Sequence, residues 1–146
     1  MSVAEVCTRG AVTVLSSAAL DEVAAIMRDR HVGAVVVTKA PLDAPVVVGI
    51  VTDRDIVRAQ LERAEPLSRM RADEVMTRNP LILNEHQSVA EAISQLQARG
   101  VRRAPVIDAS GLLVGVVSTD DLLARVSEEL LGLAQLVTRQ PSRESA

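Results

Sequence analysis

The chain has 146 residues, the size of one domain or of two small units that share a core. Hydrophobic residues make up 48% of it, but Phe, Trp and Tyr are absent, so a bound ring must be held by aliphatic side chains and no aromatic platform for single-stranded nucleic acid exists. The net charge of -3 disfavours a surface that binds polyanions. Cys7 is the only cysteine, which excludes an internal disulfide and fits a reducing compartment.

Neither a signal peptide nor a membrane-spanning segment is expected. The N-terminus has no charged stretch followed by an apolar run, and no apolar stretch reaches about eighteen residues. We therefore predict a cytoplasmic protein that contacts neither membranes nor nucleic acid.

The sequence contains an internal repeat that covers almost the whole chain. Residues 5–9 (EVCTR) return as 74–78 (EVMTR), and 48–56 (VGIVTDRDI) return as 114–122 (VGVVSTDDL). We therefore divide the chain into repeat 1 (1–63), a connector (64–73), repeat 2 (74–136) and a tail. The tail, 137–146, is polar and contains Pro141, so it is expected to be disordered.

Each repeat is predicted to fold as β-α-β-β-α, because apolar residues recur at helical spacing and short β-branched runs follow them. Gly100 follows the first helix of repeat 2, at the position where a left-handed residue commonly ends a helix. His31 occupies the same position in repeat 1, and His tolerates a positive φ better than most residues. His31 is therefore interpreted as a turn residue. The predicted strands are 12–15, 34–38, 46–52, 81–83, 104–107 and 112–118; the predicted helices start at 20, 53, 89 and 119, the last of them ending at 136.

One polar motif occurs in both repeats, as Gly49-x-x-Thr52-x-x-Asp55 and Gly115-x-x-Ser118-x-x-Asp121. In each copy a strand ends at the hydroxyl residue and a helix begins, and the first N–H groups of a helix can receive a phosphate. The Asp could accept both hydroxyls of a ribose, and Gly could leave room for a base. Both sequences are also ordinary helix N-caps that need no ligand, and duplication would copy a cap as readily as a site.

The chain from about residue 4 to 134 resembles a tandem pair of CBS (cystathionine-β-synthase-type) domains, a stand-alone Bateman module. The resemblance depends on 75–80 (VMTRNP), 100–108 (GVRRAPVID) and 115–122 (GVVSTDDL), with 31–37 and 49–55 as their counterparts. It implies an α/β (α+β) fold in which the two repeats pack with pseudo-twofold symmetry through their sheets. It also implies two clefts that bind an adenosine-containing ligand.

The same resemblance assigns ten site residues by position. It implies that Asp55 and Asp121 hold ribose hydroxyls, and that Thr52 and Ser118 lie at phosphate. It places the base against Ile50, Val116 and the extended segments around Thr13 and Ile82. Arg102 and Arg103 precede a strand where family members place a phosphate-binding Arg, whereas repeat 1 has Gly33 and Ala34 there. We therefore expect unequal sites; a solvated edge is the alternative for the two arginines.

The expected function is that of a regulatory sensor and not of an enzyme. Candidate ligands are AMP, ADP and ATP, then S-adenosylmethionine or NAD, and no cofactor or metal is required. The output would reach an unknown protein effector in trans through a population shift. The alternative is a ligand-free dimerisation or interaction scaffold. Because 119–136 carries more leucine than a two-repeat core needs, we also predict a homodimer.

Overall fold

The computed structural model describes residues 1–39 and 43–144, with side chains placed as far as residue 139. In chain order its elements are α1 (Val3–Val6), β1 (Thr8–Arg9), β2 (Thr13–Leu15), α2 (Leu20–Arg30), β3 (Ala34–Lys39), β4 (Val46–Thr52), α3 (Asp53–Glu62), η1 (Leu67–Arg69), α4 (Ala72–Val75), β5 (Thr77–Arg78), β6 (Leu83–Asn84), α5 (Val89–Arg99), β7 (Arg103–Ile107), β8 (Leu113–Ser118) and α6 (Thr119–Glu144).

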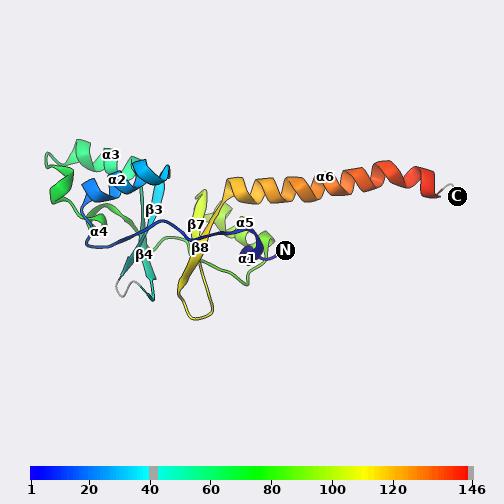
Figure 1. Ribbon diagram of the computed structural model, residues 1–146, viewed down its shortest axis with the longest axis horizontal. Coiled ribbons are helices and arrows are strands. Elements are labelled where there is room, and N and C mark those ends of the chain that lie inside the picture. Colours follow the sequence, from blue (N-terminus) through cyan, green and yellow to red (C-terminus); the bar gives the residue numbers. More distant parts are fainter. Residues whose placement is uncertain (40–42, 145–146) are drawn as a thin grey trace.

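The predicted α/β fold of two β-α-β-β-α repeats is confirmed. The strands form two four-stranded sheets, ordered β2-β3-β4-β5 and β6-β7-β8-β1. Figure 1 shows one lobe with α2, α3 and α4 beside β3 and β4, and a second lobe with α1 and α5 beside β7 and β8. The two strand orders become identical when the repeats are interchanged, which is the pseudo-twofold relation that a duplicated sequence implies.

The two repeats exchange their first residues, a feature that the sequence analysis missed. Strand β1 pairs with β8 of repeat 2, and β5 pairs with β4 of repeat 1. The residues that precede these strands go with them: Val3 of α1 belongs to the core of the second lobe, and Met70 and Ala72, at the end of the connector, belong to the core of the first. Burying a side chain the size of Val3 or Met70 stabilises by about 1.5–3 kcal/mol, so each lobe takes part of its core from outside its own repeat.

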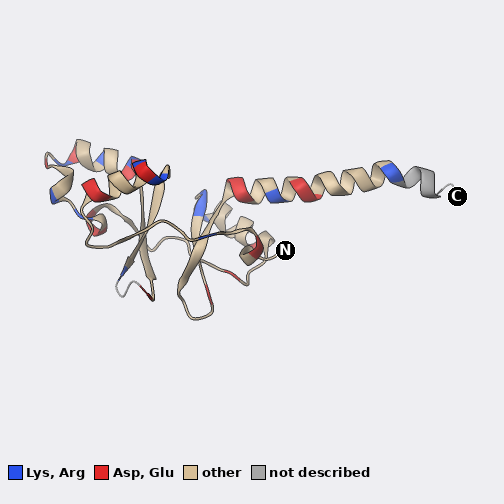
Figure 2. Ribbon diagram, in the orientation of Figure 1, with Lys and Arg blue, Asp and Glu red and all other residues tan. Residues whose placement is uncertain are grey.

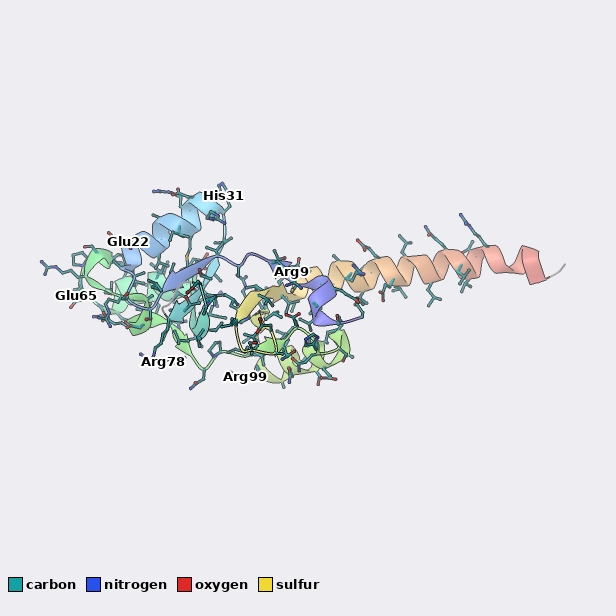
Figure 3. The ribbon with its side chains drawn as sticks, turned by 60° about the horizontal axis from the view of Figure 1, so that its bottom comes forward. Arg9, Glu22, His31, Glu65, Arg78 and Arg99 are labelled. Carbon is teal, nitrogen blue, oxygen red and sulfur yellow. The ribbon has the colours of Figure 1, made fainter. Side chains whose placement is uncertain are left out.

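The ends of α2 and α5 confirm the interpretation of His31. Its φ is 55° and its ψ is 46°, in the left-handed region, and its N–H donates to the carbonyl of Met27. Gly100 caps α5 in the same conformation, with φ 64° and ψ 33°. Figure 3 shows His31 at the tip of α2, and it lines neither of the clefts described below.

The last helix is longer than predicted. Helix α6 continues to Glu144, so both its expected end at residue 136 and the expected disorder of 137–144 are wrong. The residues just before this segment, 130–136 (LLGLAQL), are rich in leucine and favour helix, and the hydroxyl of Thr138 donates to the carbonyl of Ala134 at 2.9 Å, within the helix. Pro141 therefore does not end the helix. Figure 1 shows the helix projecting away from both lobes.

Candidate functional site

Two clefts lie where the two sheets meet, and we name them after one hydroxyl residue in each. The Ser118 cleft has a volume of about 340 Å³ and the Thr52 cleft one of about 500 Å³. Gly33, Ile50 and Arg103 line both, so the clefts adjoin at the boundary between the repeats.

Each cleft is built from both repeats. In the Thr52 cleft, the strand–helix turn of repeat 1 (residues 50–54) faces the extended segment and the loop before β7 from repeat 2 (77–81 and 99–103). In the Ser118 cleft the roles are reversed: residues 116–120 of repeat 2 face 8–12 and 32–36 of repeat 1. A ligand in either cleft would touch both repeats at once.

Six of the ten predicted site residues line the clefts. Ile50, Thr52, Arg102 and Arg103 line the Thr52 cleft, and Ile50, Arg103, Val116 and Ser118 line the Ser118 cleft. These residues lie at strand ends or in the loop before β7.

The other four predicted residues are not among the lining residues. In place of Thr13 and Ile82, the cleft walls include their predecessors Val12 and Leu81. Thr13 is the exposed first residue of β2, and Ile82 is also exposed. In place of Asp55 and Asp121, the walls include the exposed Asp53 and Asp120, one or two residues nearer the strand end.

In repeat 1 the motif forms the N-cap that was the alternative interpretation. The N–H of Asp55 donates to Thr52 Oγ1 at 3.2 Å, and the N–H of Thr52 donates back to Asp55 Oδ2 at 2.9 Å. The N–H of Asp53 donates to the carbonyl of Gly33 at 2.9 Å, and the N–H of Arg54 donates to Asp53 Oδ1 at 2.8 Å. The first N–H groups of α3 therefore already have acceptors, so a phosphate in this cleft would depend on side chains.

In repeat 2 the hydroxyl of the motif caps the helix in the same way, but the Asp carboxylate has a different partner. The N–H of Asp121 donates to Ser118 Oγ at 3.1 Å, and the N–H of Thr119 donates to the carbonyl of Arg102 at 2.8 Å. The carboxylate of Asp121, however, accepts a long bond of 3.5 Å from the hydroxyl of Thr8, on the exchanged strand β1. Thr8 lines the Ser118 cleft. Asp121 is therefore linked to this cleft through the side chain of Thr8 and does not line it directly.

The two clefts differ in charge. The Thr52 cleft is lined by one acidic residue, Asp53, and by four arginines: Arg54, Arg99, Arg102 and Arg103. The Ser118 cleft is lined by one basic residue, Arg103, and one acidic residue, Asp120. Figure 2 shows the basic segment at the start of β7, beside the boundary between the lobes.

Three of these arginines are available to an anion. Among the described residues, no salt bridge engages Arg54, Arg102 or Arg103. Arg99 is partly committed, because its Nη2 donates to the carbonyl of Asn79 at 2.8 Å; Figure 3 shows it on the same side of the molecule as Arg78. The sequence analysis missed Arg54 and Arg99, although Arg54 lies two residues after Thr52.

The motif glycines have a different role from the predicted one. A Cβ on Gly49 would lie 2.5 Å from Met76 Sδ and 2.9 Å from the carbonyl oxygen of Thr77, on the exchanged strand β5. Gly115 has the same relation to Thr8 of β1. Both glycines therefore leave room for a crossing strand, and not for a base.

The described residues contain no group of three or more His, Cys, Asp or Glu side chains that could hold a metal ion. Among the helices of the described part of the chain, none is long and apolar enough to span a membrane.

The chain matches the CBS domain family over residues 3–62 and 72–128. It therefore belongs to that family and carries two tandem CBS domains. It is 31% identical over 123 residues to the uncharacterized protein MK0525 of Methanopyrus kandleri, a match that covers 84% of this chain and 61% of MK0525. The chain thus spans about three fifths of that relative's length.

Two solved structures share the fold. One is CBSX2 in complex with AMP, at a TM-score of 0.74 and 21% identity, covering 87% of this chain and 96% of that one. The other is the CBS domain pair of protein MJ0100 in complex with 5-methylthioadenosine and S-adenosyl-L-methionine, at a TM-score of 0.73 and 21% identity, covering 88% and 98%. Both proteins hold adenosine ligands.

Proposed function

We propose that the chain is a regulatory module that binds a phosphorylated adenosine ligand, AMP, ADP or ATP, in the Thr52 cleft. The observation that carries this proposal is the charge of that cleft, four arginines against one aspartate. Arginine binds phosphate in a bidentate manner. Because the α3 N–H groups are occupied, Arg102, Arg103 and Arg54 are the groups that would contact the phosphates.

The remaining walls suit the nucleoside. Ile50, Pro80, Leu81 and Val101 line the Thr52 cleft and offer aliphatic surface to a base. Thr52 Oγ1 accepts from Asp55 N–H but keeps its own proton to donate. The adenosine ligands of CBSX2 and MJ0100 support an adenosine compound over other phosphates. S-adenosylmethionine and NAD are weaker candidates, because the first lacks phosphate and the second is large.

We propose that the two sites are unequal. At the positions of Arg102 and Arg103, repeat 1 has Gly33 and Ala34, and the Ser118 cleft accordingly has no excess of positive charge. A ligand with several phosphates would therefore favour the Thr52 cleft, and the Ser118 cleft would take at most a ligand with little negative charge.

Signalling would follow from the composite walls. A ligand that contacts residues 50–54 of one repeat and 99–103 of the other stabilises one relative arrangement of the repeats over others. A protein effector that recognises this arrangement would then respond in trans. This proposal gives the module a regulatory role without catalysis.

A dye-based thermal shift tests the proposal, because the chain has no Trp or Tyr to report unfolding. AMP, ADP, ATP, S-adenosylmethionine and NAD would each be added, with inorganic phosphate as the control. A ligand at about a hundred times its Kd should stabilise by roughly 2.7 kcal/mol, several degrees for this length. A shift with a phosphorylated adenosine ligand and none with phosphate supports the proposal.

The second candidate is a ligand-free interaction scaffold. It is favoured by the helix caps of α3 and α6, which the chain satisfies by itself. No thermal shift with any adenosine compound would make it the better assignment.

A further inference from the structure

Helix α6 presents an apolar face that the described part of the chain leaves exposed. The helix packs against β8 and α1 near its start, and Figure 1 shows the remainder extending beyond both lobes. Leu122 is buried at its base, but the larger apolar side chains that follow are exposed: Leu123, Val126, Leu130, Leu131, Leu133, Leu136 and Val137.

Five of these side chains follow a heptad pattern. Leu123, Val126, Leu130, Leu133 and Val137 are separated by alternating steps of three and four residues, the 3.5-residue period of a coiled-coil seam. Their exposed fractions are 67, 39, 65, 58 and 61%. We name these five residues the α6 seam. We propose that the α6 seam pairs with the same seam of a second copy of this chain.

The residues that flank the seam allow two identical helices to approach. At the positions on either side of it, Glu129 alone carries a charge; the others are Leu122, Ser127, Ala134 and Leu136. The remaining charges of this part, Arg125 and Glu128, lie at heptad positions that point away from the seam. Residues 130–138 carry no charge, and Figure 2 shows the corresponding stretch of α6 in tan.

An apolar groove at the root of α6 extends the same surface. It has a volume of about 400 Å³ and lies between α5 and α6. Leu123 and Val126 of the seam form one wall, and Ile93, Leu96 and Val101 form the other. The contact surface thus continues from the projecting helix onto the second lobe.

The exposed apolar area reaches the lower limit for a specific dimer. The exposed parts of the seam, of Leu136 and of the groove add up to on the order of 500 Å² per copy, and a pair would bury about 1,000 Å², the smallest area expected of a specific interface. A closed pair of identical surfaces also leaves no seam open to further copies. The seam lines neither cleft, so this dimer does not depend on the proposed ligand.

Light scattering coupled to gel filtration tests the proposal with the full chain at about 50 μM, a concentration at which an interface with a Kd of about 1 μM is mostly formed. Wild type should show twice the 15.6 kDa of one chain. The double variant Leu130→Glu/Leu133→Glu should be a monomer. The matched control is Leu131→Glu, because Leu131 is 60% exposed but lies off the seam; it should remain a dimer.

Far-UV circular dichroism would verify that both variants keep the wild-type helix content. A monomeric wild type overturns the proposal. It is also overturned if the double variant remains a dimer, or if Leu131→Glu dissociates as completely as the double variant, which would indicate association without a defined seam.

Discussion

The carbonyl oxygen of Thr8 lies too close to Gly115 to leave room for a Cβ there, and the carbonyl oxygen of Thr77 lies in the same way against Gly49. The two short strands that carry Thr8 and Thr77 cross from one repeat into the sheet of the other. The glycines of the repeated motif thus serve the exchange that joins the repeats. The exchange in turn places the clefts, since Thr8 and Thr77 each line one of them.

Gly115→Ala should therefore destabilise the fold. A methyl group there would meet backbone and not a flexible side chain, so β1 must move, at a cost of about 1–3 kcal/mol. Urea unfolding followed by circular dichroism measures the change. The control is Gly132→Ala on α6, where a Cβ meets nothing; it should stabilise by up to about 1 kcal/mol, because alanine favours helix. Equal effects of the two substitutions would contradict this account of the motif.

Loss of the N-cap hydroxyl should weaken α3. Thr52→Ala removes the acceptor for the N–H of Asp55, which should cost about 1 kcal/mol in urea unfolding. Thr52→Ser keeps a hydroxyl at the same place and should cost much less. If the Ala and Ser variants unfold at the same urea concentration, the cap contributes nothing, and a ligand role for Thr52 becomes the stronger explanation of the motif.

Arg102 should discriminate phosphate from nucleoside. Arg102→Ala should weaken AMP binding about 10- to 100-fold, the range expected for a lost charge-assisted hydrogen bond, and should leave adenosine binding nearly unchanged. Calorimetric titration of both compounds measures this. Arg58→Ala is the control, because Arg58 is an exposed residue of α3 that lines neither cleft. Unchanged AMP binding by the Arg102 variant would exclude the assignment.

The sequence was sufficient for most of the fold because its signals are local. The predicted strand at 46–52 coincides with β4 (Val46–Thr52), and the left-handed caps at His31 and Gly100 were expected. Strands β1 and β5 have two residues each, too few for a periodic pattern. Their partners lie far away in sequence, so no local signal could reveal the exchange.

The candidate site was predicted less completely, for a related reason. Residue types at a strand–helix turn identified Thr52 and Ser118, which line the clefts. The choice between neighbours, Asp53 or Asp55 and Leu81 or Ile82, depends on which side chain faces the other repeat. The packing of the two sheets determines this orientation, and the sequence of one repeat alone does not predict it.

Acid should weaken the attachment of α4 to α3. Arg63 Nη1 donates to Glu74 Oε2 at 2.9 Å, and this hydrogen bond, with one from the backbone N–H of Arg71, lowers the pKa of Glu74. A carboxyl whose pKa is lower in the folded chain binds its proton more readily when unfolded. Its stabilising contribution is therefore complete above the unfolded pKa, about 4.3, and is lost as the pH falls through the folded value.

Glu74→Gln removes this contribution at every pH. The Tm of wild type should therefore exceed that of the variant near neutral pH, and the difference should shrink as the pH falls below about 4.3 and the wild-type carboxyl also becomes neutral. Both side chains are on the surface, so about 1 M salt should reduce the neutral-pH difference as well. Arg63→Gln should show the same narrowing, because it removes the other partner of the pair. A difference in Tm that stays constant from neutral to acid pH would mean that the ion pair does not stabilise the fold.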